Sequence, residues 1–193
     1  INERFTKVIV NERIVAYINS LDRGNSPICN TIEKEAIEDD VPIIRKEMGN
    51  LLKVLLELKQ PQSILEVGTA VGYSSILMSE NMPEGCIIDT IENYDKRIPI
   101  ARNNFKRAGK EDCIRLIEGD AMEVLKELEG PYDFIFMDAA KGQYINYLPE
   151  ILRLMPKGGL LITDNILQEG ELVESRYVCL LYTSPSPRDR QKS

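Results

Sequence analysis

The sequence predicts an α/β fold in which a parallel β-sheet carries helices on both faces. From residue 61 onward, five short apolar runs alternate with amphipathic segments of about ten residues, a pattern typical of βαβ units. Glycine or acidic residues follow the first three runs, as expected where a parallel sheet presents its carboxyl ends to a ligand. The length of 193 residues suits one domain with its own core.

The first sixty residues are predicted to be helices that form a cap over the ligand end of the sheet. Apolar residues at helical spacing predict the first helix, namely Ile14, Val15, Ile18 and Leu21. Asn30 and Thr31 form a capping pair before an acidic helical stretch at 33–40, and Pro42 then breaks the chain. A longer helix follows, with an apolar face that consists of Leu51, Leu52, Leu55 and Leu58.

The remaining elements follow in strict alternation. The predicted strands span residues 64–67, 86–91, 114–117, 134–137 and 160–163. The predicted helices between them span residues 73–82, 95–108, 121–128 and 144–155. We expect the first strand to lie beside the fourth, which places the ligand at the point where the strand order reverses.

The composition excludes several classes of site and partner. The chain has no histidine, which rules out a Ser-His-Asp unit, a histidine base and a histidine-ligated zinc. Its four cysteines are scattered, so we predict a reduced, cytoplasmic protein. No apolar run is long enough for a membrane span and the N-terminus lacks the apolar core of a signal peptide. A formal charge of −7 gives no global support for binding a phosphate backbone.

A nucleoside site is predicted at the ends of the first three strands. Gly68 and Gly72 follow the first strand and allow a sharp turn with close ligand approach beside a helix N-terminus. Glu92 follows the second strand, where a carboxylate can accept both hydroxyls of a ribose. The small turn at 119–121 could lie against the edge of an adenine ring. Each feature alone also fits an ordinary turn or an exposed acid, but together they indicate a nucleoside ligand.

A cation site is predicted at the ends of the last two strands. Asp138 follows the fourth strand, and Asp164 and Asn165 follow the fifth. Carboxylate and amide oxygens suit Mg²⁺ or a similar hard ion, and not zinc. Either aspartate taken singly could instead cap a helix. Lys141, three residues after Asp138, strengthens the case for a site.

Residues 8–178 resemble the class I, cation-dependent O-methyltransferases of the catechol and caffeoyl-CoA type, which use S-adenosylmethionine. The segments E-V-G-T-A-V-G-Y-S, T-I-E-N, D-A-A-K-G-Q-Y and I-T-D-N occur in the order and spacing of that family. They are most similar to its bacterial branch that methylates 5-hydroxyuridine in tRNA. The resemblance implies a Rossmann-like class I methyltransferase fold whose last strands are missing from this chain.

The resemblance also implies roles for individual residues. Cofactor contacts would come from Ile44, Glu66, Gly68, Ser74, Glu92, Asp120, Ala121 and Asp138. A divalent cation, Mg²⁺ or another hard ion, would be held by Asp138, Asp164 and Asn165. Lys141 and Asp138 would be the catalytic residues, with Lys141 beside the acceptor hydroxyl.

The acceptor is predicted to be the 5-hydroxyuridine of tRNA, and a small catechol or caffeoyl-CoA-like molecule is the alternative. The 5-hydroxyl and 4-carbonyl of that base form a chelating pair like the two oxygens of a catechol. A tRNA would need a local basic surface, for which the candidates are Arg45, Lys46, Lys141, Lys96, Arg97, Arg102, Lys106 and Arg107. The last five share one helix and could equally form an ordinary solvated face.

Two readings outside this chemistry are disfavoured. The glycine spacing is not the G-x-G-x-x-G of a nicotinamide-dependent oxidoreductase, and an inactive interaction domain would not need the cation ligands and Lys141. We expect no membrane partner, and a homodimer is left open.

The two ends of the chain depart from the domain pattern. Residues 179–193 contain two prolines and no periodicity, and residues 179–189 match the translation of a sequencing-library adaptor. We therefore expect one methyltransferase domain at 1–178, incomplete at its C-terminus, followed by a non-native tail at 179–193 without stable structure. The resemblance places the native start near Val8 or Ile9. It also predicts that the strand at 160–163 is left as an exposed edge.

Overall fold

The computed structural model describes residues 11–166 and contains one parallel five-stranded sheet. The strand order β3-β2-β1-β4-β5 confirms the predicted α/β fold and the predicted neighbourhood of the first and fourth strands. The strands are β1 (Ser63–Val67), β2 (Ile87–Glu92), β3 (Ile114–Glu118), β4 (Phe134–Met137) and β5 (Leu160–Thr163).

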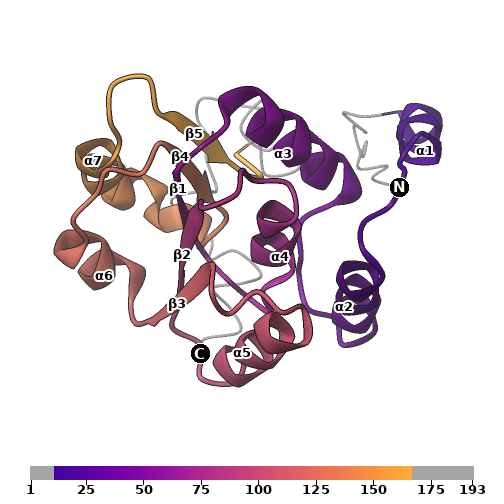
Figure 1. Ribbon diagram of the computed structural model, residues 1–193, viewed down its shortest axis with the longest axis horizontal. Helices are drawn as coiled ribbons and strands as arrows, with labels where there is room; N and C mark the ends of the chain where they lie inside the picture. Colours follow the sequence, from indigo (N-terminus) through magenta and orange to yellow (C-terminus); the bar gives the residue numbers. More distant parts are fainter. Residues whose placement is uncertain (1–10, 167–193) are drawn as a thin grey trace, which may run out of the picture.

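Helices cover both faces of the sheet, as predicted. Figure 1 shows α6 and α7 on one face and α3, α4 and α5 on the other, with α2 outside this second layer and α1 beyond it. The helices are α1 (Glu12–Ser20), α2 (Pro27–Glu38), α3 (Lys46–Lys59), α4 (Tyr73–Ser79), α5 (Ile98–Arg107), α6 (Ala121–Glu127) and α7 (Tyr144–Leu154). The short 3-10 helix η1 (Lys141–Gln143) precedes α7.

The core lies in two layers, one on each face of the sheet. Alternate residues of a strand point to opposite faces, so Phe134 and Phe136 of β4 pack toward α3, α4 and α5. Ile135 and Met137 pack toward α6 and α7. Burial on both faces explains why the strands appear in the sequence as continuous apolar runs.

The predicted start of α2 at Asn30 and Thr31 is wrong. The helix begins at Pro27, where the Ser26 Oγ accepts a hydrogen bond from the backbone N–H of Cys29 at 3.2 Å. Serine is a strong N-cap, and proline suits the first helical position because it lacks the N–H that would be unpaired there. Thr31 lies inside the helix and donates its hydroxyl to the Pro27 carbonyl at 2.8 Å.

The predicted apolar face of α3 is wrong for two of its four leucines. Leu51 and Leu58 are 47% and 77% exposed, whereas the buried positions are Gly49, Leu52 and Leu56. The absence of a side chain at Gly49 explains why the buried face of α3 lies on the side of Gly49, Leu52 and Leu56. A Cβ there would lie 3.1 Å from Leu77 of α4, so the glycine allows α3 and α4 to pack closely along this line.

Several predictions concern the two ends of the chain. The non-native tail at 179–193 and the native start near Val8 lie outside the described residues. Within residues 11–166, β5 lies at one end of the sheet and pairs with β4 alone. In the same part of the chain no helix is long and apolar enough to cross a membrane.

Candidate active site

A cleft opens at the carboxyl ends of the strands, where the sequence predicts the ligand. It has a volume of about 910 Å³ including its open mouth. Its walls are the ends of β1 and β2, the turns that follow β1, β2, β3 and β4, the first residues of α4 and α6, the segment before α3, and one residue of α7. This position at the reversal of strand order is where doubly wound sheets bind their ligands.

Gly68 brings the turn after β1 against the end of β4. Its φ is +106°, and a Cβ at this position would lie 2.3 Å from the backbone carbonyl oxygen of Asp138. The Gly68 backbone N–H donates to the Ile91 carbonyl at 3.1 Å, and that of Asp138 donates to the Val67 carbonyl at 3.0 Å. The glycine therefore allows three strand ends to meet at the cleft floor.

Glu92 lines the cleft and its carboxylate is held by backbone donors. Oε2 accepts from the N–H of Ala70 at 2.8 Å, and Oε1 accepts from the N–H groups of Asn93 at 3.0 Å and Tyr94 at 2.9 Å. A carboxylate offers about four lone-pair sites, so part of its acceptor capacity remains for a ligand. The three bonds fix the orientation of the carboxylate, and therefore of the lone pairs that can still accept from a ligand.

Glu66 is fully buried beneath the cleft and does not line it. Its carboxylate accepts hydrogen bonds from the hydroxyls of Ser74 at 2.5 Å, Ser75, and Thr90 at 2.6 Å. Burial raises the pKa of Glu66 to about 7, although the three hydroxyls favour the ionised form. Ser74 lines the cleft, so the structure places Glu66 one layer behind it.

The three predicted cation ligands lie on neighbouring strand ends. Met137 pairs with Thr163 in the β4–β5 register, and the Asp164 N–H donates to the Met137 carbonyl at 3.1 Å. Asp138 lines the cleft and is 7% exposed. The Asp164 carboxylate accepts from the backbone N–H of Asn165 at 2.7 Å and from its Nδ2 at 3.1 Å.

This donor set fits a hard divalent cation, because all of its side-chain ligands offer oxygen. Among the described residues, no three His, Cys, Asp or Glu side chains are grouped as a metal site. A cation held here would therefore need the amide oxygen of Asn165 as its third side-chain ligand. Asp164 is half-buried and Asn165 is exposed, which leaves this side open to an acceptor.

The other predicted contacts are distributed around the cleft. Ile44 and Ala121 line it. Asp120 does not line it; its Oδ1 caps α6 by accepting from the Met122 N–H at 2.9 Å. Lys141 begins η1, directly after the β4 turn.

The cleft is also lined by three residues that no sequence pattern assigned to the cofactor site, namely Tyr94, Arg97 and Tyr147. The Arg97 guanidinium lies 5.3 Å from the centre of the Tyr94 ring, which is a cation–π distance. Tyr94 and Arg97 could have been predicted at the cleft, because they follow Glu92 by only a few residues. No comparable signal existed for Tyr147, which reaches the cleft only because α7 packs beside β4.

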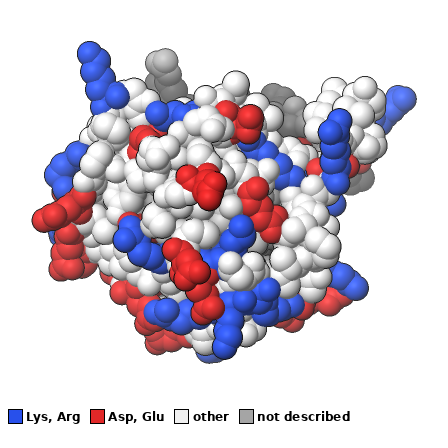
Figure 2. All heavy atoms as spheres, in the orientation of Figure 1, with Lys and Arg blue, Asp and Glu red and all other residues white. Residues whose placement is uncertain are grey.

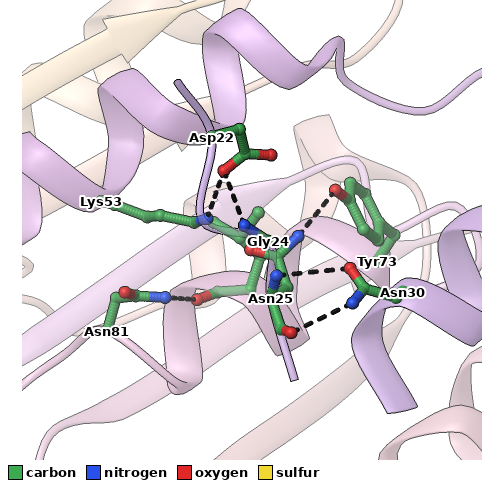
Figure 3. Close-up of polar contacts among 8 residues, drawn as sticks. Asp22, Gly24, Asn25, Asn30, Lys53, Tyr73 and Asn81 are labelled. Carbon is green, nitrogen blue, oxygen red and sulfur yellow. Dashed lines mark hydrogen bonds and ion pairs between the residues drawn. The ribbon is translucent and has the colours of Figure 1, made fainter. Parts of the chain in front are cut away.

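The N-terminal helices are tied to the cleft wall through Tyr73. Figure 3 shows the chain before α2, where the Asp22 carboxylate accepts from the Gly24 N–H at 3.1 Å and lies 3.8 Å from Lys53 Nζ. The Asn25 Nδ2 donates to the Tyr73 hydroxyl at 3.5 Å. Because Tyr73 lines the cleft, this link connects the predicted helical cap to the site.

The basic helix face predicted as a candidate nucleic-acid surface is divided in the structure. Arg97 faces the cleft. Arg102 donates to Glu118 and Arg107 to Glu35, at 2.5 and 2.6 Å. Figure 2 likewise shows basic and acidic side chains interleaved over this side of the molecule. Arg102 and Arg107 therefore lie in mixed-charge pairs, and the three arginines do not form a continuous basic patch.

Comparisons with known proteins show the family of this chain. The profile of the family described as O-methyltransferase matches residues 17–178. The catechol O-methyltransferase of Niastella koreensis is 34% identical over 135 residues, which cover 68% of this chain and 61% of that protein. The caffeoyl-CoA O-methyltransferase 2 of Populus trichocarpa is 36% identical over 135 residues, which cover 65% of this chain and 53% of that protein.

A solved structure extends the likeness to the fold. The crystal structure of the O-methyltransferase from Bacillus cereus in complex with SAH has a TM-score of 0.78 and 27% identity, and it covers 92% of this chain and 80% of that one. The chain spans only about half to three fifths of the length of the two curated relatives.

Proposed function

Because the chain belongs to the O-methyltransferase family, we propose that it transfers the methyl group of S-adenosylmethionine to a hydroxyl oxygen with the help of a divalent cation. The observation that carries this proposal is the single cleft that joins Glu92, at the end of β2, to Asp138, at the end of β4. A nucleoside group and a cation-bound acceptor could therefore lie side by side in it. The solved Bacillus cereus relative holds SAH, the demethylated form of this cofactor.

The chain's own residues would bind and orient the cofactor. Glu92 would accept a ribose hydroxyl with the capacity that its three backbone donors leave free. Ile44 and Ala121 would provide apolar walls. Ser74, held from behind by Glu66, would present its hydroxyl to the polar end of the cofactor. Such positioning is the main contribution that an enzyme can make to displacement at carbon.

Asp138, Asp164 and Asn165 would hold the cation. When bound, a hard divalent cation lowers the pKa of an acceptor hydroxyl and orients its oxygen. Asp138 is well placed to hold such a cation, because it is buried at the cleft floor and belongs to the strand end that Gly68 contacts. Lys141 is proposed to take the acceptor proton as its neutral amine, a form that a bound cation nearby would favour, since its backbone directly follows this strand end.

The proposed acceptor is the 5-hydroxyuridine of tRNA. The support is the resemblance in D-A-A-K-G-Q-Y and I-T-D-N, together with the exposed pair Arg45 and Lys46. These two residues directly follow Ile44, which lines the cleft. Phosphates of a bound tRNA would therefore meet positive charge beside the cleft.

A small catechol-type acceptor is the second candidate. The observations that favour it are the names of the two curated relatives and the pairing of Arg102 and Arg107 with acids. Both acceptors offer two neighbouring oxygens to a cation, so the cation site does not distinguish them.

Transfer of labelled methyl from S-adenosylmethionine, with Mg²⁺ present, tests the activity and the acceptor together. The substrates would be hypomodified tRNA and a panel of catechols at several salt concentrations. A tRNA acceptor predicts an apparent affinity that falls steeply with salt, whereas the affinity for a catechol would barely change. Transfer to catechol alone would identify the second candidate, and no transfer to either substrate would contradict the activity.

A further inference from the structure

Tyr144, the first residue of α7, places its hydroxyl between two backbone carbonyls of the predicted cation site. The hydroxyl donates toward the Met137 oxygen at 3.2 Å and the Asp164 oxygen at 3.3 Å. Met137 is the last residue of β4 and directly precedes Asp138, whereas Asp164 directly follows β5. A single phenol thus bridges the two strand ends that carry the ligands.

The same two strand ends are also joined by the backbone. β4 and β5 have four residues each. Beyond their last paired residues, the backbone bond between them is that from the Asp164 N–H to the Met137 carbonyl, at 3.1 Å. The Tyr144 hydroxyl bonds to that same Met137 oxygen and to the Asp164 oxygen, so it adds a second link between the two strand ends.

Tyr144 also acts on the peptide that orients Asn165. The Asp164 carbonyl belongs to the peptide bond that supplies the Asn165 N–H, and this N–H donates to Asp164 Oδ1. Asn165 has a φ of +55°, in the left-handed region that asparagine adopts more readily than most non-glycine residues. The hydroxyl therefore holds one side of the peptide while the Asp164 carboxylate holds the other.

We infer that Tyr144 is a positioning residue for the cation site, setting the distance between Asp138 and the Asp164–Asn165 pair through their backbone. This inference rests on the cation site of the proposed function. It assigns Tyr144 no contact with cofactor or acceptor. Outer contacts that orient metal ligands commonly contribute tenfold or more to affinity.

The alternative is that Tyr144 only fills space, since it packs against the core on the α7 face. Tyr132 provides a matched control, because it belongs to the same core and its hydroxyl donates to Asp89 Oδ2 at 2.6 Å. Asp89 lies in the middle of β2, away from the strand ends. Tyr144→Phe and Tyr132→Phe therefore remove the same hydroxyl group, together with its hydrogen bonds, at different places in the same core.

The experiment measures Mn²⁺ and SAH binding to the full chain and to both variants by calorimetry, with thermal unfolding in parallel. We expect Tyr144→Phe to weaken Mn²⁺ binding about five- to tenfold and to leave SAH binding unchanged. Tyr132→Phe is expected to lower the unfolding temperature without changing Mn²⁺ affinity. Mn²⁺ affinity of Tyr144→Phe equal to wild type, or reduced equally in both variants, would overturn the positioning role.

The design also separates failure of the inference from failure of the proposed function. If the wild-type chain binds SAH but no Mn²⁺, the cation site itself is refuted and the role of Tyr144 with it. If wild type binds both ligands and Tyr144→Phe does the same, only the positioning role fails.

Discussion

The carboxylate of Glu92 and the backbone N–H of Ala70 lie 2.8 Å apart, which joins the end of β2 to the turn after β1. The same carboxylate also holds the N–H groups of Asn93 and Tyr94. One side chain thus organises two walls of the cleft and also lines it. Its loss would affect both the shape of the site and its contact with a ribose.

Glu92→Ala should weaken SAH binding by about 1.5–3 kcal/mol, roughly ten- to 100-fold, because hydrogen bonds to a charged acceptor are lost. Calorimetry measures this directly. Glu118→Ala is the matched control, since Glu118 is the partner of Glu92 in the β2–β3 register but pairs with Arg102 and does not line the cleft. Equal losses in the two variants would remove Glu92 from the cofactor site.

Gly68→Ala should destabilise the fold by about 3 kcal/mol or more, because the new Cβ meets the Asp138 carbonyl and the backbone has a positive φ. Gly85→Ala separates these two causes. Gly85 has a φ of +82° but no atom within 4 Å of the new Cβ, so its cost should be only about 1 kcal/mol. Urea unfolding that gave the same cost for both variants would argue against the close contact at Gly68.

The contribution of Glu66 to the free energy of unfolding should fall as pH rises from about 4.5 to about 7. Burial raises the pKa of Glu66 in the folded state to about 7, so the folded chain binds this proton more tightly than the unfolded chain does. Ionisation in the folded state then costs about 3 kcal/mol. Glu66→Gln cannot ionise and should reduce this loss of stability between pH 5 and pH 8. Unfolding curves with the same pH dependence in both proteins would contradict the buried ionisation.

Asp138→Asn should abolish detectable Mn²⁺ binding while the protein stays folded, because an amide of similar size replaces a carboxylate ligand. Methyl transfer by the wild-type protein should cease in excess EDTA and return with added Mg²⁺. Full turnover in chelator would contradict a cation-dependent mechanism.

The strands were predictable because their apolar runs are buried on both faces, and β4 and β5 have the predicted bounds. The glycine turn and Glu92 could be located for a related reason, since residues directly after a strand must lie at its carboxyl end. The helix starts were less predictable. At α2, the Ser26-Pro27 pair competes with Asn30 and Thr31, and only the cap on Cys29 shows which pair prevails.

Contacts between distant segments could not be predicted from the sequence. Asp89 of β2 is buried and binds Arg115 at 2.6 Å and the Tyr132 hydroxyl, but its partners come from separate elements. Tyr144 likewise reaches Met137 and Asp164 only after α7 has packed on the sheet. These side chains depend on tertiary packing, for which a local pattern gives no signal.

The proposed function requires one cleft that holds the cofactor at the Glu92 end and a divalent cation at the Asp138 end. Anomalous diffraction from crystals grown with SAH and Mn²⁺ tests it most directly. We expect one Mn²⁺ peak within reach of Asp138, Asp164 and Asn165, and a ribose on Glu92 in the same cleft. SAH outside this cleft, or Mn²⁺ bound by other residues, would contradict it.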